Sequence, residues 1–127
     1  MGLIILDTSV LVDHLRKSVP ARQAFHGARQ AGHRVMASVV TRVELLAGMR
    51  TQERRVTREL IESLEWVAVS EEIAELGGNL ARELRSSHPG IGLADILIGA
   101  TAQHVGGELW TRNPRHFPMF PGLRPPY

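Results

Sequence analysis

Asp7 is an acidic residue at the junction of a predicted strand and a predicted helix. It directly follows the apolar run Leu3–Leu6 and precedes Thr8 and Ser9, where a helical pattern begins. Four apolar residues are too few for a helix and predict a buried strand. In open α/β sheets, ligands bind where a strand ends and a helix begins. Asp7 is therefore expected either to cap the new helix or to help bind a cation.

Glu44 shares a predicted helix face with apolar residues. Val40, Glu44 and Ala47 follow the i, i+4, i+7 spacing, which places their side chains on one face of a helix. An alternative is a capping box made by Thr41 and Glu44. That box requires a helix starting at Thr41, whereas the apolar pattern starts at Val39. Both interpretations stay open on this motif alone.

Asp95 is the only Asp, Glu, Lys or Arg between Arg85 and Glu108. Its place near the start of an apolar helix would gain about 0.3–1 kcal/mol from the helix dipole. Burying an unpaired carboxylate costs several times as much, so Asp95 should lie at a rim or have a partner. A cation shared with Asp7 and Glu44 explains all three acids together.

The ligand chemistry predicts which cation this would be. Carboxylate oxygens without cysteine favour Mg²⁺ or Mn²⁺ over zinc, and the chain contains no cysteine. Such an ion activates water and stabilises the charge that develops on a phosphodiester. Asp13 is a weaker candidate, because Arg16 and Lys17 lie three and four residues further on and predict a surface ion pair.

Length and composition indicate the number of domains, the distribution of charge and the cellular location. The 127 residues predict a single domain spanning 1–127. Residues 1–60 hold ten basic and five acidic side chains, and residues 61–127 hold five basic and eight acidic ones. All the cations but Lys17 are arginines, which suit bidentate phosphate contacts. The lack of cysteine, and an apolar run too short for a signal peptide or membrane span, fit a cytoplasmic location.

Hydrophobic periodicity predicts strands that alternate with helices. This alternation favours an α/β fold with a parallel sheet that is covered on both faces. Strands are expected at 3–6, 34–37, 66–69 and 108–110, and helices at 8–17, 20–31, 39–48, 52–65, 71–86 and 93–105.

Four motifs in order give the chain a family resemblance. Ile4–Ser9, Thr41–Gly48, Leu93–Ala102 and Leu109–Phe117 together resemble the PIN-domain ribonucleases, and within them the VapC toxins of bacterial toxin–antitoxin pairs. Each motif is weak alone, whereas four in the right order across the whole chain are specific. The resemblance implies a three-layer α/β/α sandwich with a central parallel sheet. It also implies Mg²⁺- or Mn²⁺-dependent endonucleolytic cleavage of RNA, a homodimer, and a cognate antitoxin protein that covers the site.

The resemblance also assigns roles to individual residues. Asn113 stands where many relatives have Asp. Its amide can offer one carbonyl oxygen to a metal ion but no charge, which disfavours a tightly held second metal ion. His116 is close by in the sequence, but a histidine there is more typical of a surface or core edge. The implied metal-binding catalytic acids are Asp7, Glu44 and Asp95, and the implied supporting polar groups are Thr8, Ser9 and Thr111.

Arginines are the expected contacts to RNA phosphates. For Arg55 and Arg58, however, Glu59 and Glu62 lie four residues further on, so these arginines also fit pairs on a solvated helix face. The full set of candidates is Arg42, Arg50, Arg54, Arg55 and Arg112.

Two other classes of protein compete with this interpretation. A catalytically idle RNA-binding module would explain Asn113 as a sign of decay. A Mg²⁺-dependent phosphoacceptor signalling domain also gathers acids at strand ends, but it requires a lysine late in the chain. The only lysine here is Lys17.

Overall fold

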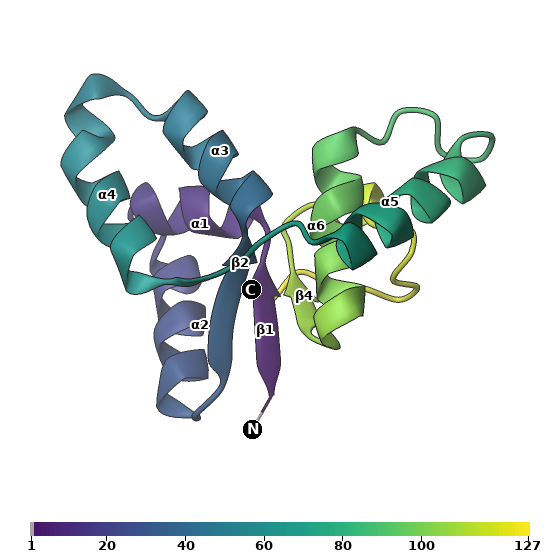
Figure 1. The fold of residues 1–127 in the computed structure, drawn as a ribbon. Helices are drawn as coiled ribbons and strands as arrows, with labels where there is room; N and C mark the ends of the chain where they lie inside the picture. The colour runs from purple at the N-terminus through teal and green to yellow at the C-terminus, as the bar shows by residue number, and fades with distance from the viewer. Residues whose placement is uncertain (1) are drawn as a thin grey trace.

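The fold is built around one parallel sheet. The computed structural model describes residues 2–127, and in this part of the chain the sheet has the strand order β3-β2-β1-β4. Figure 1 labels β2, β1 and β4 of this sheet. In the register of the ladders, Ile5 lies opposite Met36 on one side and Leu109 on the other. The strands are β1 (Leu3–Leu6), β2 (Arg34–Ser38), β3 (Glu65–Val67) and β4 (Glu108–Trp110).

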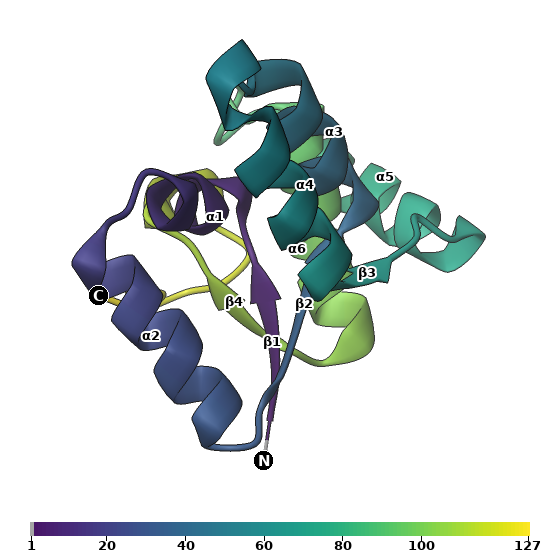
Figure 2. The same ribbon diagram turned by 90° about the vertical axis from the view of Figure 1, so that its left-hand side faces the viewer.

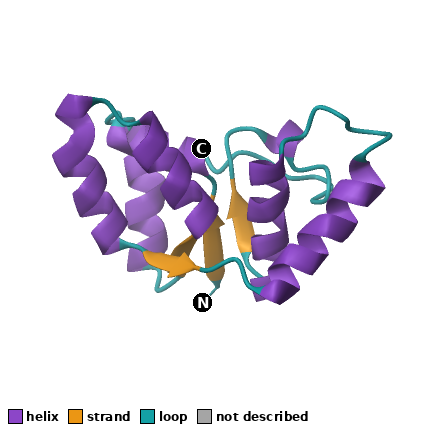
Figure 3. Ribbon diagram, turned by 45° about the horizontal axis from the view of Figure 1, so that its top comes forward, coloured by secondary structure: helices purple, strands orange, loops and turns teal. Residues whose placement is uncertain are grey.

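Helices cover both faces of the sheet (Figure 3). This confirms the predicted three-layer α/β/α sandwich with a central parallel sheet. Seen from the side, α1 and α2 lie on one side of β1, and α6 lies on the other (Figure 2). The helices are α1 (Thr8–Leu15), α2 (Val19–Gln30), α3 (Val39–Gly48), α4 (Arg54–Ser63), α5 (Glu71–Leu84) and α6 (Leu93–Val105).

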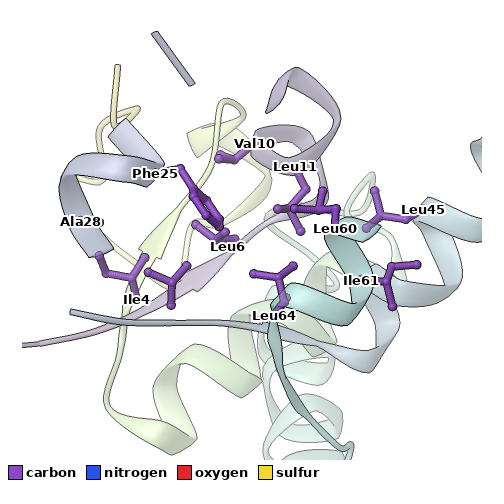
Figure 4. Close-up of a cluster of buried hydrophobic side chains, with 12 residues drawn as sticks. Ile4, Leu6, Val10, Leu11, Phe25, Ala28, Leu45, Leu60, Ile61 and Leu64 are labelled. Atoms are coloured by element: carbon purple, nitrogen blue, oxygen red, sulfur yellow. The ribbon is translucent and has the colours of Figure 1, made fainter. Parts of the chain in front are cut away.

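The alternation of side chains along β1 divides the core into two layers. Ile4 and Leu6 point to one face, where they pack with apolar residues of α1, α2, α3 and α4 (Figure 4). Ile5 points to the other face and packs with Ile98 of α6 and with Phe117. A strand buried on both faces must be apolar at every position, which explains the uninterrupted run in β1.

Serine side chains set the start of several helices. Ser18 accepts a hydrogen bond from the backbone N–H of Ala21 at the start of α2, and Ser70 accepts one from Ile73 at the start of α5. Such caps satisfy backbone donors that have no partner within the helix. At its other end, α6 stops at Gly106, whose φ of +69° is the left-handed conformation that glycine adopts without strain.

Some predicted boundaries are wrong. The single helix expected over 52–65 is instead the 3-10 helix η1 (Thr51–Glu53) followed by α4, and the chain turns extended at Leu64. The strand expected at 66–69 is β3, which begins and ends earlier. The helix expected over 8–17 ends at Leu15, because Lys17 adopts a left-handed φ of +65°.

A second 3-10 helix, η2 (Pro114–His116), was not predicted. It follows β4 after the three residues 111–113 and brings the C-terminal motif back toward the sheet. No helix within residues 2–127 has the length and apolar character needed to cross a membrane.

Candidate functional site

Asp7 lies at the carboxyl end of β1, where its backbone N–H still donates to the carbonyl of Trp110 on the neighbouring strand (2.8 Å). It occupies the position before α1, but its side chain makes no capping hydrogen bond. The capping interpretation of Asp7 is therefore wrong. Asp7 as a whole residue is only 4% exposed, so protein groups must stabilise its charge.

Two hydroxyl groups hold the same oxygen of Asp7. Ser9 Oγ donates to Oδ2 at 2.7 Å, and the buried Thr111 Oγ1 donates to Oδ2 at 2.8 Å. Oδ1 receives no hydrogen bond from residues 2–127. Because Asp7 lines a pocket, one of its oxygens remains available to a ligand while the other fixes the side chain.

Glu44 reaches the same pocket from α3. Its Oε1 accepts a hydrogen bond from Thr8 Oγ1 at 2.6 Å, and the same Thr8 oxygen lies within hydrogen-bond distance of Thr41 Oγ1 (3.1 Å). The residue before α3 is Ser38, whose side chain accepts from the backbone N–H of Val40. Thr41 is a buried residue inside the helix, so the capping box with Glu44 is not formed.

Asp95 projects from the first turn of α6 and is half-buried, with 24% of its side chain exposed. Burial raises the pKa of its carboxyl group, and the negative charges of Asp7 and Glu44 raise it further. His116 acts in the opposite direction, because its Nδ1 lies 3.0 Å from Asp95 Oδ2. The sequence predicted a rim position or a partner for Asp95, and the structure has both.

His116 is the site residue that sequence reasoning missed. It lies at the surface as expected, with 56% of its side chain exposed, and it also lines the pocket and contacts Asp95. The only signal in the sequence was its closeness to Asn113. Nothing local shows that η2 folds back over the start of α6.

These side chains surround one pocket with a volume of about 590 Å³. The three predicted acids and Asn113 enter it from β1, α3, α6 and the segment after β4. Lys17, which a phosphoacceptor domain would need at such a site, does not line it. The lining residues are Asp7, Thr8, Ser9, Val12, Asp13, Glu44, Asp95, Arg112, Asn113 and His116.

The donor set fits a hard divalent cation. It consists of carboxylates and an amide oxygen, which Mg²⁺ and Mn²⁺ prefer. Burial, together with the negative charges of Asp7 and Glu44, raises the pKa of Asp95. No three His, Asp or Glu side chains in residues 2–127 are already arranged around a common metal position. Ion binding would therefore require the side chains to turn further into the pocket.

The predicted RNA-contacting arginines divide into two groups. Arg112 lines the pocket, whereas Arg42, Arg50 and Arg54 do not. The guanidinium of Arg42 instead lies 5.5 Å from the centre of the Trp66 ring.

The surface-pair alternative is confirmed for Arg55, which pairs with Glu59 at 3.1 Å. For Arg58 and Glu62, no ion pair forms within the described residues. The ion pair expected between Asp13 and Arg16 or Lys17 is wrong, because Asp13 pairs with Arg112 at 3.2 Å.

Comparison with known proteins identifies the family of the chain and agrees with its fold. The PIN domain family model matches residues 4–120, and the chain belongs to that family. Ribonuclease VapC19 of Mycobacterium tuberculosis is 46% identical over 97% of this chain and 98% of the relative. Ribonuclease VapC10 of the same organism is 44% identical over 98% and 93%. Within the PIN domain family, the chain thus groups with the VapC ribonucleases.

Solved structures share the whole fold. A toxin–antitoxin complex from Klebsiella pneumoniae superposes with a TM-score of 0.78 at 27% identity, covering 98% of both chains. DNA-bound VapBC from Salmonella typhimurium gives a TM-score of 0.82 at 25% identity over 98% of this chain and 96% of the other. VapBC2 from Rickettsia felis gives 0.83 at 21% identity, over 95% of each chain, and this likeness bears on the fold alone.

Proposed function

We propose that this protein is a Mg²⁺- or Mn²⁺-dependent endoribonuclease that acts as the toxin of a toxin–antitoxin pair. One observation carries the proposal. Asp7, Glu44 and Asp95, which are far apart in the sequence, line one pocket at the carboxyl end of β1. This pocket occurs in a chain whose relatives at 44–46% identity are ribonucleases.

Asp7, Glu44 and Asp95 would hold the ion, and the amide oxygen of Asn113 could add a neutral ligand. When bound, a divalent ion supplies an activated water and stabilises charge on the phosphodiester. The protein's own part is to keep the carboxylates in place. Hydroxyl groups bonded to Asp7 and Glu44 restrict their side chains, and His116 restrains Asp95.

The proposed partners follow from the related complexes. The matched structures from Klebsiella pneumoniae and Salmonella typhimurium are toxin–antitoxin and VapBC complexes. We propose that this chain likewise binds a cognate antitoxin protein that blocks the pocket, and that it forms a homodimer. The antitoxin should restore growth when it is expressed together with the toxin.

Purified protein should cleave total cellular RNA in the presence of Mg²⁺ or Mn²⁺, and EDTA should stop the reaction. Asp7→Asn removes a charge while keeping the shape of the side chain, so it should reduce cleavage at least about 100-fold. The matched control is Glu108→Gln, an exposed acid outside the pocket, which should cleave like the parent. Cleavage by Asp7→Asn at the parental rate would refute the proposal.

A catalytically idle RNA-binding module is the alternative that Asn113 favours, because this residue adds no charge to the pocket. Calorimetric titration with Mn²⁺ separates the two functions. The enzyme should bind Mn²⁺ with a signal that disappears in Asp7→Asn. A protein that binds RNA but neither binds Mn²⁺ nor cleaves would be the idle module.

A further inference from the structure

Three side chains from distant parts of the chain meet at the rim of the pocket. Asp13 Oδ2 accepts hydrogen bonds from Tyr127 Oη at 2.7 Å and from Arg112 Nη1 at 3.2 Å. The guanidinium carbon of Arg112 lies 4.9 Å from the centre of the Tyr127 ring. Tyr127 belongs to the C-terminal segment, and Asp13 belongs to α1. The tail thus meets a residue of α1 and a residue of the loop after β4 in one contact, which we call the rim cluster (Asp13, Arg112 and Tyr127).

The rim cluster fixes both ends of Arg112. Its backbone N–H donates to Ser9 Oγ at 3.1 Å, and the same hydroxyl donates to Asp7. Its guanidinium is held by the carboxylate of Asp13 on one side and lies against the Tyr127 ring on the other, as in a cation–π contact. The position of Arg112 is therefore tied to the carboxylate at the floor of the pocket.

Arg112 retains binding capacity after these contacts. Its guanidinium has five N–H donors, and one nitrogen is engaged by Asp13 in this structure. With 45% of its side chain exposed, the remaining donors can reach a ligand in the pocket that Arg112 lines. Fork-like guanidinium donors match the oxygens of a phosphate.

Tyr127 acts as a hydrogen-bond donor over the whole useful pH range. Partial burial raises the pKa of its hydroxyl to about 12, and the hydrogen bond to Asp13 contributes in the same direction. The phenol therefore stays protonated, and it keeps one oxygen of Asp13 oriented toward Arg112.

We infer that Tyr127 and Asp13 are positioning residues that hold Arg112 ready to bind a backbone phosphate of the RNA. This inference rests on the proposed ribonuclease function. A half-exposed ion pair such as Arg112–Asp13 contributes little to folding stability, so a stabilising role alone does not explain the rim cluster. Restricting a flexible arginine before the substrate arrives reduces the entropy lost on binding. Asp13 thus serves Arg112 and is not a fourth metal ligand.

The test measures RNA binding without cleavage. A labelled pool of mixed-sequence single-stranded RNA is titrated in EDTA against the parent, Tyr127→Phe, Asp13→Asn and Arg112→Ala. Tyr127→Phe keeps the ring and loses only the hydroxyl, and it should weaken binding about three- to tenfold. Asp13→Asn should have a similar effect. Arg112→Ala should weaken binding more and should reduce the slope of log affinity against log salt by about 0.7.

A double variant shows whether Tyr127 acts through Arg112. In the Arg112→Ala background, adding Tyr127→Phe should have no further effect. With metal present, Tyr127→Phe should raise KM and leave kcat unchanged. Arg82→Ala, an exposed arginine on α5 outside the pocket, is the matched control and should bind like the parent.

The outcomes separate this inference from the proposed function. If Tyr127→Phe binds RNA as the parent does, or weakens binding equally with and without Arg112, the positioning role is refuted while the ribonuclease can stand. If the parent itself does not bind RNA in EDTA, the positioning role is likewise refuted, whereas the ribonuclease fails only if the parent also does not cleave RNA with Mg²⁺ or Mn²⁺. Thermal melting of each variant shows whether a loss of binding reflects a loss of folded protein. If Tyr127→Phe does not fold, the RNA affinity of Asp13→Asn tests the same positioning role.

Discussion

At the scale of single residues, hydrogen-bond partners decide how each acid of the pocket behaves. Asp7 is the most deeply buried of the three predicted ligands, yet two hydroxyl groups donate to it. Among residues 2–127, Asp95 has only His116 as a partner, and it lies near the charges of Asp7 and Glu44. In the absence of a cation, Asp95 is therefore the acid whose ionisation opposes folding.

The variant Asp95→Asn should be more stable than the parent at neutral pH when metal is removed. Because the folded-state pKa of Asp95 is raised, the folded chain keeps this proton to a higher pH than the unfolded chain. The protonated Asp95 carboxyl adds to the free energy of unfolding. This addition is complete below the unfolded-state pKa of about 3.9 and is lost as the pH rises through the folded-state pKa. Asparagine never ionises, so its advantage should appear only above that range, as a melting temperature higher by a few degrees.

Melting curves in EDTA at acidic and neutral pH would measure this difference. Glu83→Gln changes an exposed acid of α5 and is the control, with no such dependence on pH expected. A neutral-pH melting temperature of Asp95→Asn below that of the parent would mean that the pair with His116 outweighs burial and repulsion.

At the scale of elements, α5 packs closely against α6, which lies on the face of the sheet opposite to α1 and α2. Ile73 and Leu80 of α5 pack with Ile96 and Ala100 of α6 in one buried cluster. Gly77 lies between these two residues of α5 in the sequence, and it allows the helices to approach. A Cβ at Gly77 would lie 3.1 Å from Leu97 Cδ2, whereas one at Gly78 would meet nothing within 4 Å.

Gly78→Ala should therefore stabilise the protein more than Gly77→Ala. Both substitutions gain about 0.5–1 kcal/mol from the smaller backbone freedom of alanine in the unfolded chain. At Gly77, that gain is offset because Leu97 must move. Urea denaturation of the two variants provides a matched pair within one helix. Equal gains would show that α6 does not restrict α5 at this point.

At the scale of the whole molecule, the pocket depends on elements that only the complete fold brings together. Its acids come from the end of β1, from α3 and from α6. Ion binding should therefore stabilise the entire fold. The single domain over 1–127 and the homodimer stay predictions. Light scattering of the purified protein would measure its molar mass in solution and so test the homodimer.

Mn²⁺ should raise the melting temperature of the parent in a concentration-dependent way. A ligand that binds only the folded state adds about 2.7 kcal/mol when its free concentration is about 100 times Kd. Asp7→Asn should lose most of this shift, because it removes a charge from the proposed metal site. Glu108→Gln should keep the full shift. A shift of the same size in all three proteins would point to binding elsewhere on the surface.

The sequence by itself determined the local structure and the positions of the acids. The predicted strands at 3–6 and 108–110 and the helix at 93–105 have the observed boundaries. Burial on one or both faces leaves a periodic pattern within a few residues, and such a pattern can be read in a short window. The position of Asp7 at the end of a strand was visible for the same reason.

Only the tertiary structure decided how the acids are supported. Thr111 bonds to Asp7 and Tyr127 bonds to Asp13 over sequence separations of 104 and 114 residues. The contact of His116 with Asp95 likewise depends on η2 folding back over α6. A polar residue in a loop has no periodicity that reveals its partner, because its energy depends on which side chain the folded chain places beside it.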